Sequence, residues 1–270
     1  MNEVNERGLV LVGCGFMGKA LLQGWLANGI APEAVTVQDP TPNDWLSAQP
    51  GLRVNTPLPS EPAAIIIATK PQILTEILPD LASFGNRSTL FVSVAAGAAI
   101  ASFEAHLGSA TPVIRSMPNL PASIGAGVTA LIANPSASPA HIELARDLFQ
   151  AVGAVVELDD EDQMHAVTAL SGSGPAYIFA MTEALAKAGM DHGLPRELAM
   201  TLARQTVLGA GQMLRAPDAD AEKLRVAVTS PGGTTGAGLA AFMDGVNGIV
   251  PLAKRTVAAA RRRSLELSEV

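Results

Sequence analysis

The sequence predicts an α/β domain with a mostly parallel sheet, followed by an all-α domain. Strand patterns and helix patterns alternate through the first part of the chain, as they do in consecutive β-α-β units. After about residue 158 the strand patterns stop, and only helix patterns follow. A glycine loop also joins the first strand pattern to the first helix pattern. The predicted domains are therefore residues 1–158 and 159–270.

Eight short apolar runs in the first domain are predicted strands. The run at 63–68 is apolar throughout, which is typical of a strand covered by helices on both faces. The predicted strands are residues 9–12, 34–38, 52–54, 64–68, 89–94, 113–116, 128–133 and 154–158, and the predicted helices between most of them are residues 15–28, 72–83, 99–107 and 139–152. In a parallel sheet with right-handed crossovers, ligands bind beyond the carboxyl ends of the strands.

The second domain contains helix patterns at 162–170, 175–190, 195–214, 221–228, 236–243 and 249–267. Its most unusual segment is Ser171-Gly172-Ser173-Gly174, which interrupts a long helical pattern with two hydroxyls and two glycines. Such an interruption is either a packing kink or the wall of a binding site, and the sequence alone leaves both open.

The glycine loop Gly13-Cys14-Gly15-Phe16-Met17-Gly18 directly follows the first predicted strand and opens a predicted helix. Its G-x-G-x-x-G spacing lies in the strand–turn–helix context that a dinucleotide site requires. The first glycine allows the tight turn, the second lets the backbone approach a pyrophosphate, and the third lets helix and strand pack closely. We therefore expect a Rossmann-type domain with a nicotinamide or flavin nucleotide site. The alternative is a glycine-rich turn in another kind of α/β protein.

A second glycine loop, Thr229-Ser230-Pro231-Gly232-Gly233-Thr234-Thr235, precedes an apolar helix pattern. It offers hydroxyls and free backbone N–H groups at the start of a helix, a combination that binds small anions such as a carboxylate. An ordinary turn with a helix cap would explain Ser-Pro-Gly alone. The first glycine loop makes the binding interpretation the stronger one.

The composition agrees with a soluble cytoplasmic enzyme. The net charge of −7 argues against a nucleic-acid partner, and the single cysteine excludes an internal disulfide framework. The segment with Glu3 and Glu6 lacks the layout of a signal peptide, and no apolar run approaches the ~20 residues that span a bilayer. We expect a cytoplasmic protein without a membrane partner. The four histidines show no metal-ligand spacing, so no metal is expected.

Together these segments resemble the Δ1-pyrroline-5-carboxylate reductase family, whose members catalyse the last step of proline biosynthesis. The resemblance covers nearly the whole chain. It is carried by residues 13–18, 70–71, 93–97 and 115–119, and most strongly by residues 170–177 and 229–235. It implies a Rossmann domain followed by an all-α dimerisation and substrate domain, in a homodimer at least, possibly a homodecamer. It also implies reduction of the cyclic imine 1-pyrroline-5-carboxylate to L-proline by hydride from NADPH or NADH.

The resemblance also implies roles for individual residues. Thr235 is the catalytic candidate, because the matching threonine of the family contacts the ring nitrogen. The implied substrate-binding residues are Ser230, Gly232, Gly233, Thr234, Ser171, Gly172, Ser173 and Gly174. The implied cofactor-binding residues are Gly13, Gly15, Phe16, Met17, Gly18, Asp39, Asn55, Ala68, Lys70, Pro71, Ala95, Gly97 and Asn119. For Tyr177 a packing role is favoured over proton donation, and His165 is expected to be structural.

Asp39 departs from the family pattern. Many members carry serine, threonine or a basic residue at this position, after the second strand, where they suit a 2′-phosphate. An acidic side chain there accepts a hydrogen bond from the ribose 2′-OH and repels a phosphate. We therefore predict that NADH is used at least as well as NADPH.

Two rival interpretations are weaker. A β-hydroxyacid dehydrogenase would resemble G-x-G-x-x-x-K-x-x-x-N at the interdomain helix. Counting from Gly172 and Gly174 places Ile178 and Thr182 at the lysine and asparagine positions, so the acid/base is missing. A nucleotide sensor or scaffold without turnover would be expected to lose the 229–235 loop, which is complete here.

Overall fold

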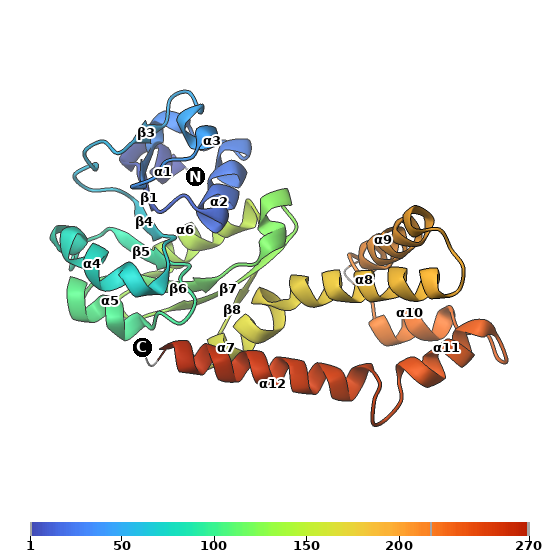
Figure 1. The fold of residues 1–270 in the computed structure, drawn as a ribbon. Coiled ribbons are helices and arrows are strands. Elements are labelled where there is room, and N and C mark those ends of the chain that lie inside the picture. Colours follow the sequence, from blue (N-terminus) through green and yellow to red (C-terminus); the bar gives the residue numbers. More distant parts are fainter. Residues whose placement is uncertain (1, 217, 269–270) are drawn as a thin grey trace. The chain divides into compact units, whose positions relative to one another are not determined.

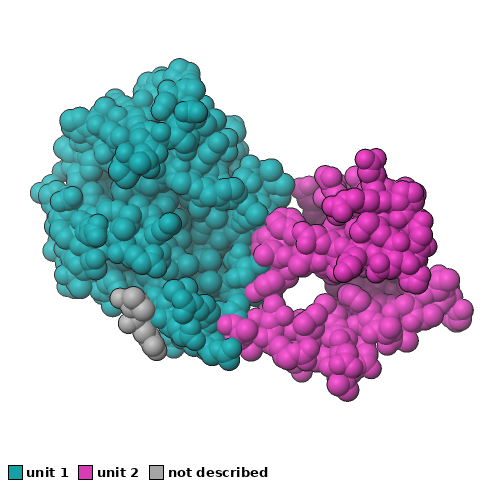
Figure 2. Space-filling model, in the orientation of Figure 1, with its two compact units in different colours: residues 1–173, 260–270 teal, residues 174–259 magenta. Residues whose placement is uncertain are grey.

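The computed structural model describes residues 2–216 and 218–268. The chain forms two compact units, which are coloured separately in Figure 2. Unit 1 takes the chain up to residue 173 and again from residue 260, and unit 2 consists of residues 174–259. The domain boundary predicted between residues 158 and 159 was placed where strand patterns give way to helix patterns. It is defined differently from the two compact units, and it stays a prediction.

A single eight-stranded sheet forms the centre of unit 1 (Figure 1). The strand order is β3-β2-β1-β4-β5-β6-β7-β8. Neighbouring strands are parallel except β6 and β7, so the predicted mostly parallel sheet is confirmed. The strands are β1 (Leu9–Val12), β2 (Val35–Gln38), β3 (Arg53–Val54), β4 (Ala64–Ile67), β5 (Leu90–Ser93), β6 (Val113–Met117), β7 (Gly127–Ala133) and β8 (Gly153–Glu157).

The sheet has a topological switch point at β1, which pairs with β2 on one side and with β4 on the other. Val12, the last residue of β1, lies opposite both Gln38 and Ile67, the last residues of its two neighbours. The loops that follow these three strands therefore begin at the same edge of the sheet. In open α/β sheets this is the place where ligands bind.

Helices cover both faces of the sheet, because alternate side chains of the strands point to opposite faces. Leu9 and Leu11 belong to one buried apolar cluster together with Trp25 of α2 (Phe16–Ala27). Val10 belongs to a second cluster together with Phe103 of α5 (Ile100–Leu107). Figure 1 shows α2 and α6 (Pro139–Gln150) on one face and α4 and α5 on the other.

The predicted helix at 72–83 is wrong in its continuity. The segment forms a 3-10 turn, Pro71–Ile73, then a short helix, α4 (Leu74–Ile77), then a second 3-10 stretch, Leu78–Phe84. Pro79 causes the break, since it lacks an N–H and its ring clashes with the preceding turn of an α-helix. Further short helices are α1 (Asn2–Arg7), α3 (Asp44–Ser47) and the 3-10 helices Pro32–Ala34 and Leu120–Ile124, and α7 (Gln163–Val167) follows β8.

Unit 2 is helical. Its longest helices, α8 (Gly174–Asp191) and α9 (Arg196–Met213), form an antiparallel hairpin. Small residues let them approach closely, because Ala186, Ala199 and Ala203 are buried, and a Cβ on Gly189 would lie 3.4 Å from that of Ala199. The unit continues with α10 (Ala221–Ala227), α11 (Thr234–Phe242) and the first half of α12 (Ile249–Ser268). None of the described helices is long and apolar enough to cross a membrane.

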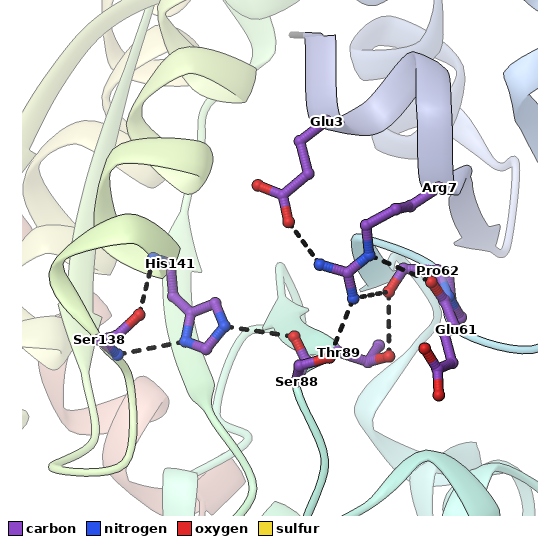
Figure 3. A network of polar contacts seen from close by, with 8 residues as sticks. All are labelled: Glu3, Arg7, Glu61, Pro62, Ser88, Thr89, Ser138 and His141. Carbon is purple, nitrogen blue, oxygen red and sulfur yellow. Dashed lines mark hydrogen bonds and ion pairs between the residues drawn. The ribbon is translucent and has the colours of Figure 1, made fainter.

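Arg7 joins the N-terminal helix α1 to the rest of unit 1 (Figure 3). Its Nε donates to the carbonyl of Glu61, and its Nη2 donates to the carbonyl of Pro62, both at 3.3 Å. The same Nη2 lies 3.1 Å from the hydroxyl oxygen of Ser88, and Glu3 forms an ion pair with the guanidinium. The side chain of Arg7 thus joins the segments that lead into β4 and β5.

His141 completes the cap of α6 in the same network (Figure 3). The backbone N–H of Ser138 donates to His141 Nδ1 at 3.1 Å, so Nδ1 is the unprotonated ring nitrogen. Nε2 therefore carries the proton, which it donates to the carbonyl of Ser88 at 3.2 Å. His141 is therefore the third-position partner of a capping box with Ser138.

His165 links α7 to the last turns of α12 inside unit 1. It is only 7% exposed, and its Nδ1 lies 3.0 Å from Ser264 Oγ. Burial lowers the pKa of His165, and the positive charges of Arg115 and Arg261 lower it further, against the opposing effect of Asp162 and Glu161. The imidazole is therefore held neutral in a structural contact.

We expect His141→Ala to lower the free energy of unfolding by about 1 kcal/mol, because it leaves the Ser138 N–H without its acceptor. His141→Gln is the matched control, since glutamine at this position restores a capping box. Thermal unfolding followed by circular dichroism measures both. Equal midpoints for the alanine variant and the wild type would contradict the assigned cap.

A second prediction concerns pH. Because the folded-state pKa of His165 lies below its ordinary value of 6.5, the unfolded chain takes up this proton first as the pH falls. The stability contributed by His165 is present above pH 6.5 and is lost as the pH drops from there towards the folded-state pKa. Urea midpoints at pH 8.0 and 5.5 should differ less for His165→Asn than for wild type, while the exposed control His192→Asn should keep the wild-type difference.

Candidate functional site

The glycine loop after β1 is shaped by two close backbone approaches. Gly13 has a φ of +89°, and a Cβ there would lie 2.8 Å from the carbonyl oxygen of Ala68. A Cβ on Gly18 would lie 2.2 Å from the carbonyl oxygen of Gly13. Both positions therefore exclude a side chain, which holds the start of α2 against the ends of β1 and β4.

Gly15 is different, because nothing lies within 4 Å of the position its Cβ would take. It is the N-cap of α2 and provides no side-chain cap, so the first-turn N–H groups of this helix have no side-chain acceptor there. Phe16 beside it is 69% exposed, and Met17 is half-buried. Free N–H groups over an open glycine fit a phosphate group, as the pyrophosphate of a dinucleotide requires.

Asp39 lies directly after β2 and bonds to the glycine loop. Its Oδ2 accepts from the N–H of Cys14 at 2.7 Å, and its Oδ1 accepts from the N–H of Thr41 at 2.8 Å. Asn55 holds the backbone of the same residue: its Oδ1 accepts from the Asp39 N–H at 2.9 Å, and its Nδ2 donates to the Asp39 carbonyl at 2.8 Å. Asn55 has a φ of +53°, a conformation that asparagine tolerates better than most residues.

A cleft of about 650 Å³ lies at this edge of the sheet. It brings together three of the predicted cofactor residues, Gly13, Asp39 and Asn55. The other residues that line it are Val12, Gln38, Pro40, Thr56, Pro57, Leu58, Thr69, Ile73, Glu76, Ile77, Asp80 and Leu81. No lysine or arginine is among these described lining residues, whereas three carboxylates are.

Cys14 packs inside the glycine loop. The side chain is only 1% exposed, and burial, with the nearby carboxylate of Asp39, raises the pKa of its thiol to about 11. The thiol therefore stays protonated at neutral pH. It fills space within the glycine loop and supplies no nucleophile.

The other predicted cofactor residues follow β4, β5 and β6 at the same edge of the sheet. Ala68 is half-buried against Gly13, and Lys70 and Pro71 begin the 3-10 turn beyond it, with Lys70 exposed. Ala95 is buried, and a Cβ on Gly97 would lie 3.3 Å from the carbonyl oxygen of Leu267 in α12. Apart from Gly13, Asp39 and Asn55, none of the predicted cofactor residues lines the large cleft.

A smaller cavity of about 230 Å³ connects Gly97 with the segment around Ser173. It therefore brings a predicted cofactor residue to a predicted substrate residue within unit 1. Its remaining lining residues are Ala96, Thr168, Ala260, Arg263, Ser264 and Leu267. Four of these come from α12. No motif in the sequence of this helix marks these residues as part of a site.

The interruption at 171–174 is a π-helical turn, Thr168–Gly172, that continues α7. The hydroxyl of Ser171 donates to the Val167 carbonyl at 3.1 Å, and that of Ser173 donates to the Thr168 carbonyl at 3.0 Å. A Cβ on Gly172 would lie 2.5 Å from Met117 Cε, so the glycine permits close packing. The segment is a packing feature, and its role as a wall of the substrate pocket stays a prediction. Gly174 begins α8 in unit 2.

Asn119 uses its whole side chain inside unit 1. It is 8% exposed, its Oδ1 accepts from the Val128 N–H at 3.0 Å, and its Nδ2 donates to the Ser171 carbonyl at 3.1 Å. This amide therefore fixes the π-helical turn against the loop after β6. Its predicted contact with a cofactor stays a prediction.

The second glycine loop belongs to unit 2 and leads into α11. The hydroxyl of Thr229 donates to the Arg225 carbonyl at 2.7 Å, and the N–H of Gly233 donates to the Ser230 carbonyl at 3.1 Å, which closes a tight turn. Gly233 is the N-cap of α11 and provides no side-chain cap. Ser230, Gly232, Thr234 and Thr235 are all exposed. The start of this helix thus offers N–H groups and hydroxyls to a ligand.

Metal chemistry has no site among the described residues. Within residues 2–216 and 218–268, no three histidine, cysteine, aspartate or glutamate side chains are arranged to hold a metal ion.

Two family models match this chain. A model described as pyrroline-5-carboxylate reductase dimerisation matches residues 161–267. A model described as NADP oxidoreductase, coenzyme F420-dependent, matches residues 9–97. The first match covers the helices that follow the sheet, and the second covers the glycine loop, Asp39 and the strands around the switch point.

Several pyrroline-5-carboxylate reductases match nearly the full chain. The pyrroline-5-carboxylate reductase of Pseudomonas aeruginosa is 38% identical over 266 residues, which cover 97% of both chains. That of Synechocystis is 39% identical over 97% of this chain and 98% of the relative. The solved structure of a pyrroline-5-carboxylate reductase from Coxiella burnetii has a TM-score of 0.89 and 33% identity, over 98% of this chain and 99% of that one. A Plasmodium falciparum pyrroline carboxylate reductase with NADP bound has a TM-score of 0.85 and 29% identity over the same shares. The chain therefore belongs to the pyrroline-5-carboxylate reductase family.

Proposed function

We propose that this chain reduces 1-pyrroline-5-carboxylate to L-proline with NAD(P)H, the last step of proline biosynthesis. The observation that carries the proposal is the presence in one chain of an open glycine loop at a sheet switch point and an uncapped, hydroxyl-rich helix start. The first suits a dinucleotide and the second suits a small carboxylate. Relatives named for this reaction match the chain over 97% of its length.

The nucleotide is assigned to unit 1. We propose that the N–H groups at the start of α2 hold the pyrophosphate over Gly15, and that Asp39 and Asn55 define the ribose end of the site. Ala68, Lys70, Pro71, Ala95, Gly97 and Asn119 would line or support the path towards the nicotinamide. The bound nucleotide supplies a hydride, and the residues of the chain orient it and exclude water.

The substrate carboxylate is assigned to unit 2. The N–H groups at the start of α11, together with the Ser230 hydroxyl, can neutralise one negative charge without a basic side chain. We propose that Gly232, Gly233 and Thr234 complete this cradle. Thr235 would hold its hydroxyl at the ring nitrogen and deliver or relay the proton that this atom gains. Ser171, Gly172, Ser173 and Gly174 are proposed to shape the pocket wall.

The chain is expected to act as an assembly. Large apolar side chains remain exposed on unit 2, and the dimerisation family model covers this part of the chain. They include Ile178, Phe179, Leu198, Leu202, Leu208, Met213, Val226 and Val228. We propose a homodimer in the cytoplasm. Analytical ultracentrifugation would separate it from a homodecamer, which the family resemblance also allows.

The first test is the initial rate of NADH and NADPH oxidation with 1-pyrroline-5-carboxylate. Thr235→Ala should lower kcat about 10²-fold, the scale of a positioned proton donor. Thr235→Ser keeps the hydroxyl and should stay within about tenfold of wild type. A wild-type rate that survives in the alanine variant would move the key group elsewhere. A wild type inactive with both nucleotides would reject the proposed reaction.

Gly15 and Gly18 offer a matched pair of variants for the nucleotide site. Gly15→Ala adds a methyl group in open space, so it should preserve the unfolding midpoint while raising the dissociation constant for the nucleotide about tenfold or more. Gly18→Ala would collide with the Gly13 carbonyl and should lower the midpoint itself. Thermal unfolding and fluorescence titration separate the two effects. Unchanged affinity in Gly15→Ala would argue against pyrophosphate binding at this loop.

A further inference from the structure

We propose that Asp39 makes this chain select NADH against NADPH, so that its nucleotide carries a free ribose 2′-OH. The inference rests on the proposed function and concerns only the adenosine end of the nucleotide. It sets this chain apart from the NADP named for one matching family model and for one related structure.

The Asp39 carboxylate lies where a dinucleotide fold binds the ribose. Asp39 follows β2 at the switch point and lines the 650 Å³ cleft together with Gly13 of the glycine loop. In a dinucleotide fold the ribose hydroxyls lie at the end of this strand, where a carboxylate accepts their hydrogen bonds. A 2′-phosphate would instead bring about −2 of charge to a negatively charged group.

Hydrogen bonds hold the Asp39 carboxylate in a fixed orientation. Both of its oxygens accept backbone N–H groups, from Cys14 at 2.7 Å and from Thr41 at 2.8 Å. The Thr41 hydroxyl also donates to Oδ1, at 3.5 Å, and because a carboxylate has about four acceptor positions, one remains for a ribose hydroxyl. The side chain cannot rotate away from a phosphate without breaking one of these bonds, and repulsion is therefore not relieved by movement.

Asn55 acts through Asp39 as a positioning residue. Its amide bridges the N–H and the carbonyl of Asp39 at 2.9 and 2.8 Å, so both of its polar atoms are already engaged. The left-handed backbone of Asn55 turns the chain at the end of β3 so that this bridge can form. Asn55 thereby supports the residue that selects the nucleotide, and its own contact with the cofactor stays a prediction.

The cleft supplies no compensating positive charge. The described lining residues add two further carboxylates, Glu76 and Asp80, and no lysine or arginine. Lys19, the single basic residue of α2, does not line the cleft, and its Nζ lies 4.9 Å from the centroid of the Trp45 ring in a cation–π contact. A 2′-phosphate would thus meet an acidic surface without a partner.

The test is direct binding of NADH and NADPH to the full chain, followed by the fluorescence of the reduced nucleotide without substrate. We expect NADH to bind at least tenfold more tightly at low ionic strength, with the ratio narrowing as salt screens the charges. Asp39→Asn keeps an acceptor but removes the charge, and it should reduce the ratio at least tenfold. Glu76→Gln removes a charge from the same cleft without touching Asp39, and it should lower the ratio much less than Asp39→Asn does.

Asn55 needs its own readout. Asn55→Gly keeps the left-handed backbone but removes the amide bridge, so the NADH preference should fall several-fold while the unfolding midpoint changes little. A structural role unrelated to Asp39 would change the midpoint and leave the preference intact.

Four results would overturn the proposal. Equal or tighter binding of NADPH by the wild type rejects the selection while leaving the proposed reaction in place. A wild-type ratio in Asp39→Asn rejects the role of Asp39. Binding of neither nucleotide rejects the proposed function as well. A further experiment needs only the wild type, so it remains possible if a variant fails to fold. It compares how well ADP-ribose and its 2′-phosphate displace bound NADH. Equal displacement by the two compounds would contradict the proposed selection.

Discussion

The nucleotide side of this molecule depends on the close approach of two backbone segments, the glycine loop after β1 and the end of β4. The absent side chain of Gly13 lets the Ala68 carbonyl lie within 2.8 Å of the place where a Cβ would stand. Gly18 lets α2 begin directly over that loop. β1 lies between β2 and β4 in the sheet. The loop after β1 therefore lies beside Asp39 at the end of β2, and both Gly13 and Asp39 line the cleft.

The sheet could be predicted from the sequence because buried parallel strands are short apolar runs with turn residues between them. All eight predicted strands are present, within two residues at each end. Features set by single residues or by short segments were harder. Pro79 divides the predicted helix at 72–83, and α1 has only Val4 buried, so it shows no apolar period. The π-helical turn at Thr168–Gly172 depends on packing against Met117, which lies far away in the sequence.

Those parts of the candidate site that belong to short local sequence motifs could be predicted. The two glycine loops and Asp39 lie at the starts of α2 and α11 and at the end of β2, as their spacing indicated. The tertiary partners were not predictable, because an amide or an imidazole does not reveal its acceptor in the sequence. Asn55 bonds to Asp39, Asn119 to Ser171 and His141 to Ser88. In each case the side chain holds backbone in place and is not merely solvated.

Unit 1 is built from two separate segments of the chain, so it cannot be completed until the second segment has been synthesised. Residues 260–268 leave the ribosome after the whole of unit 2, yet they pack into unit 1, where Ser264 meets His165 and the Leu267 carbonyl lies beside Gly97. The sheet and the glycine loop have by then long been synthesised, while the cavity beside Gly97 still lacks the α12 residues that line it. During translation, then, the sheet and the glycine loop are present before the residues of α12 that complete this cavity, and the helical unit must be synthesised before the chain can return to close it.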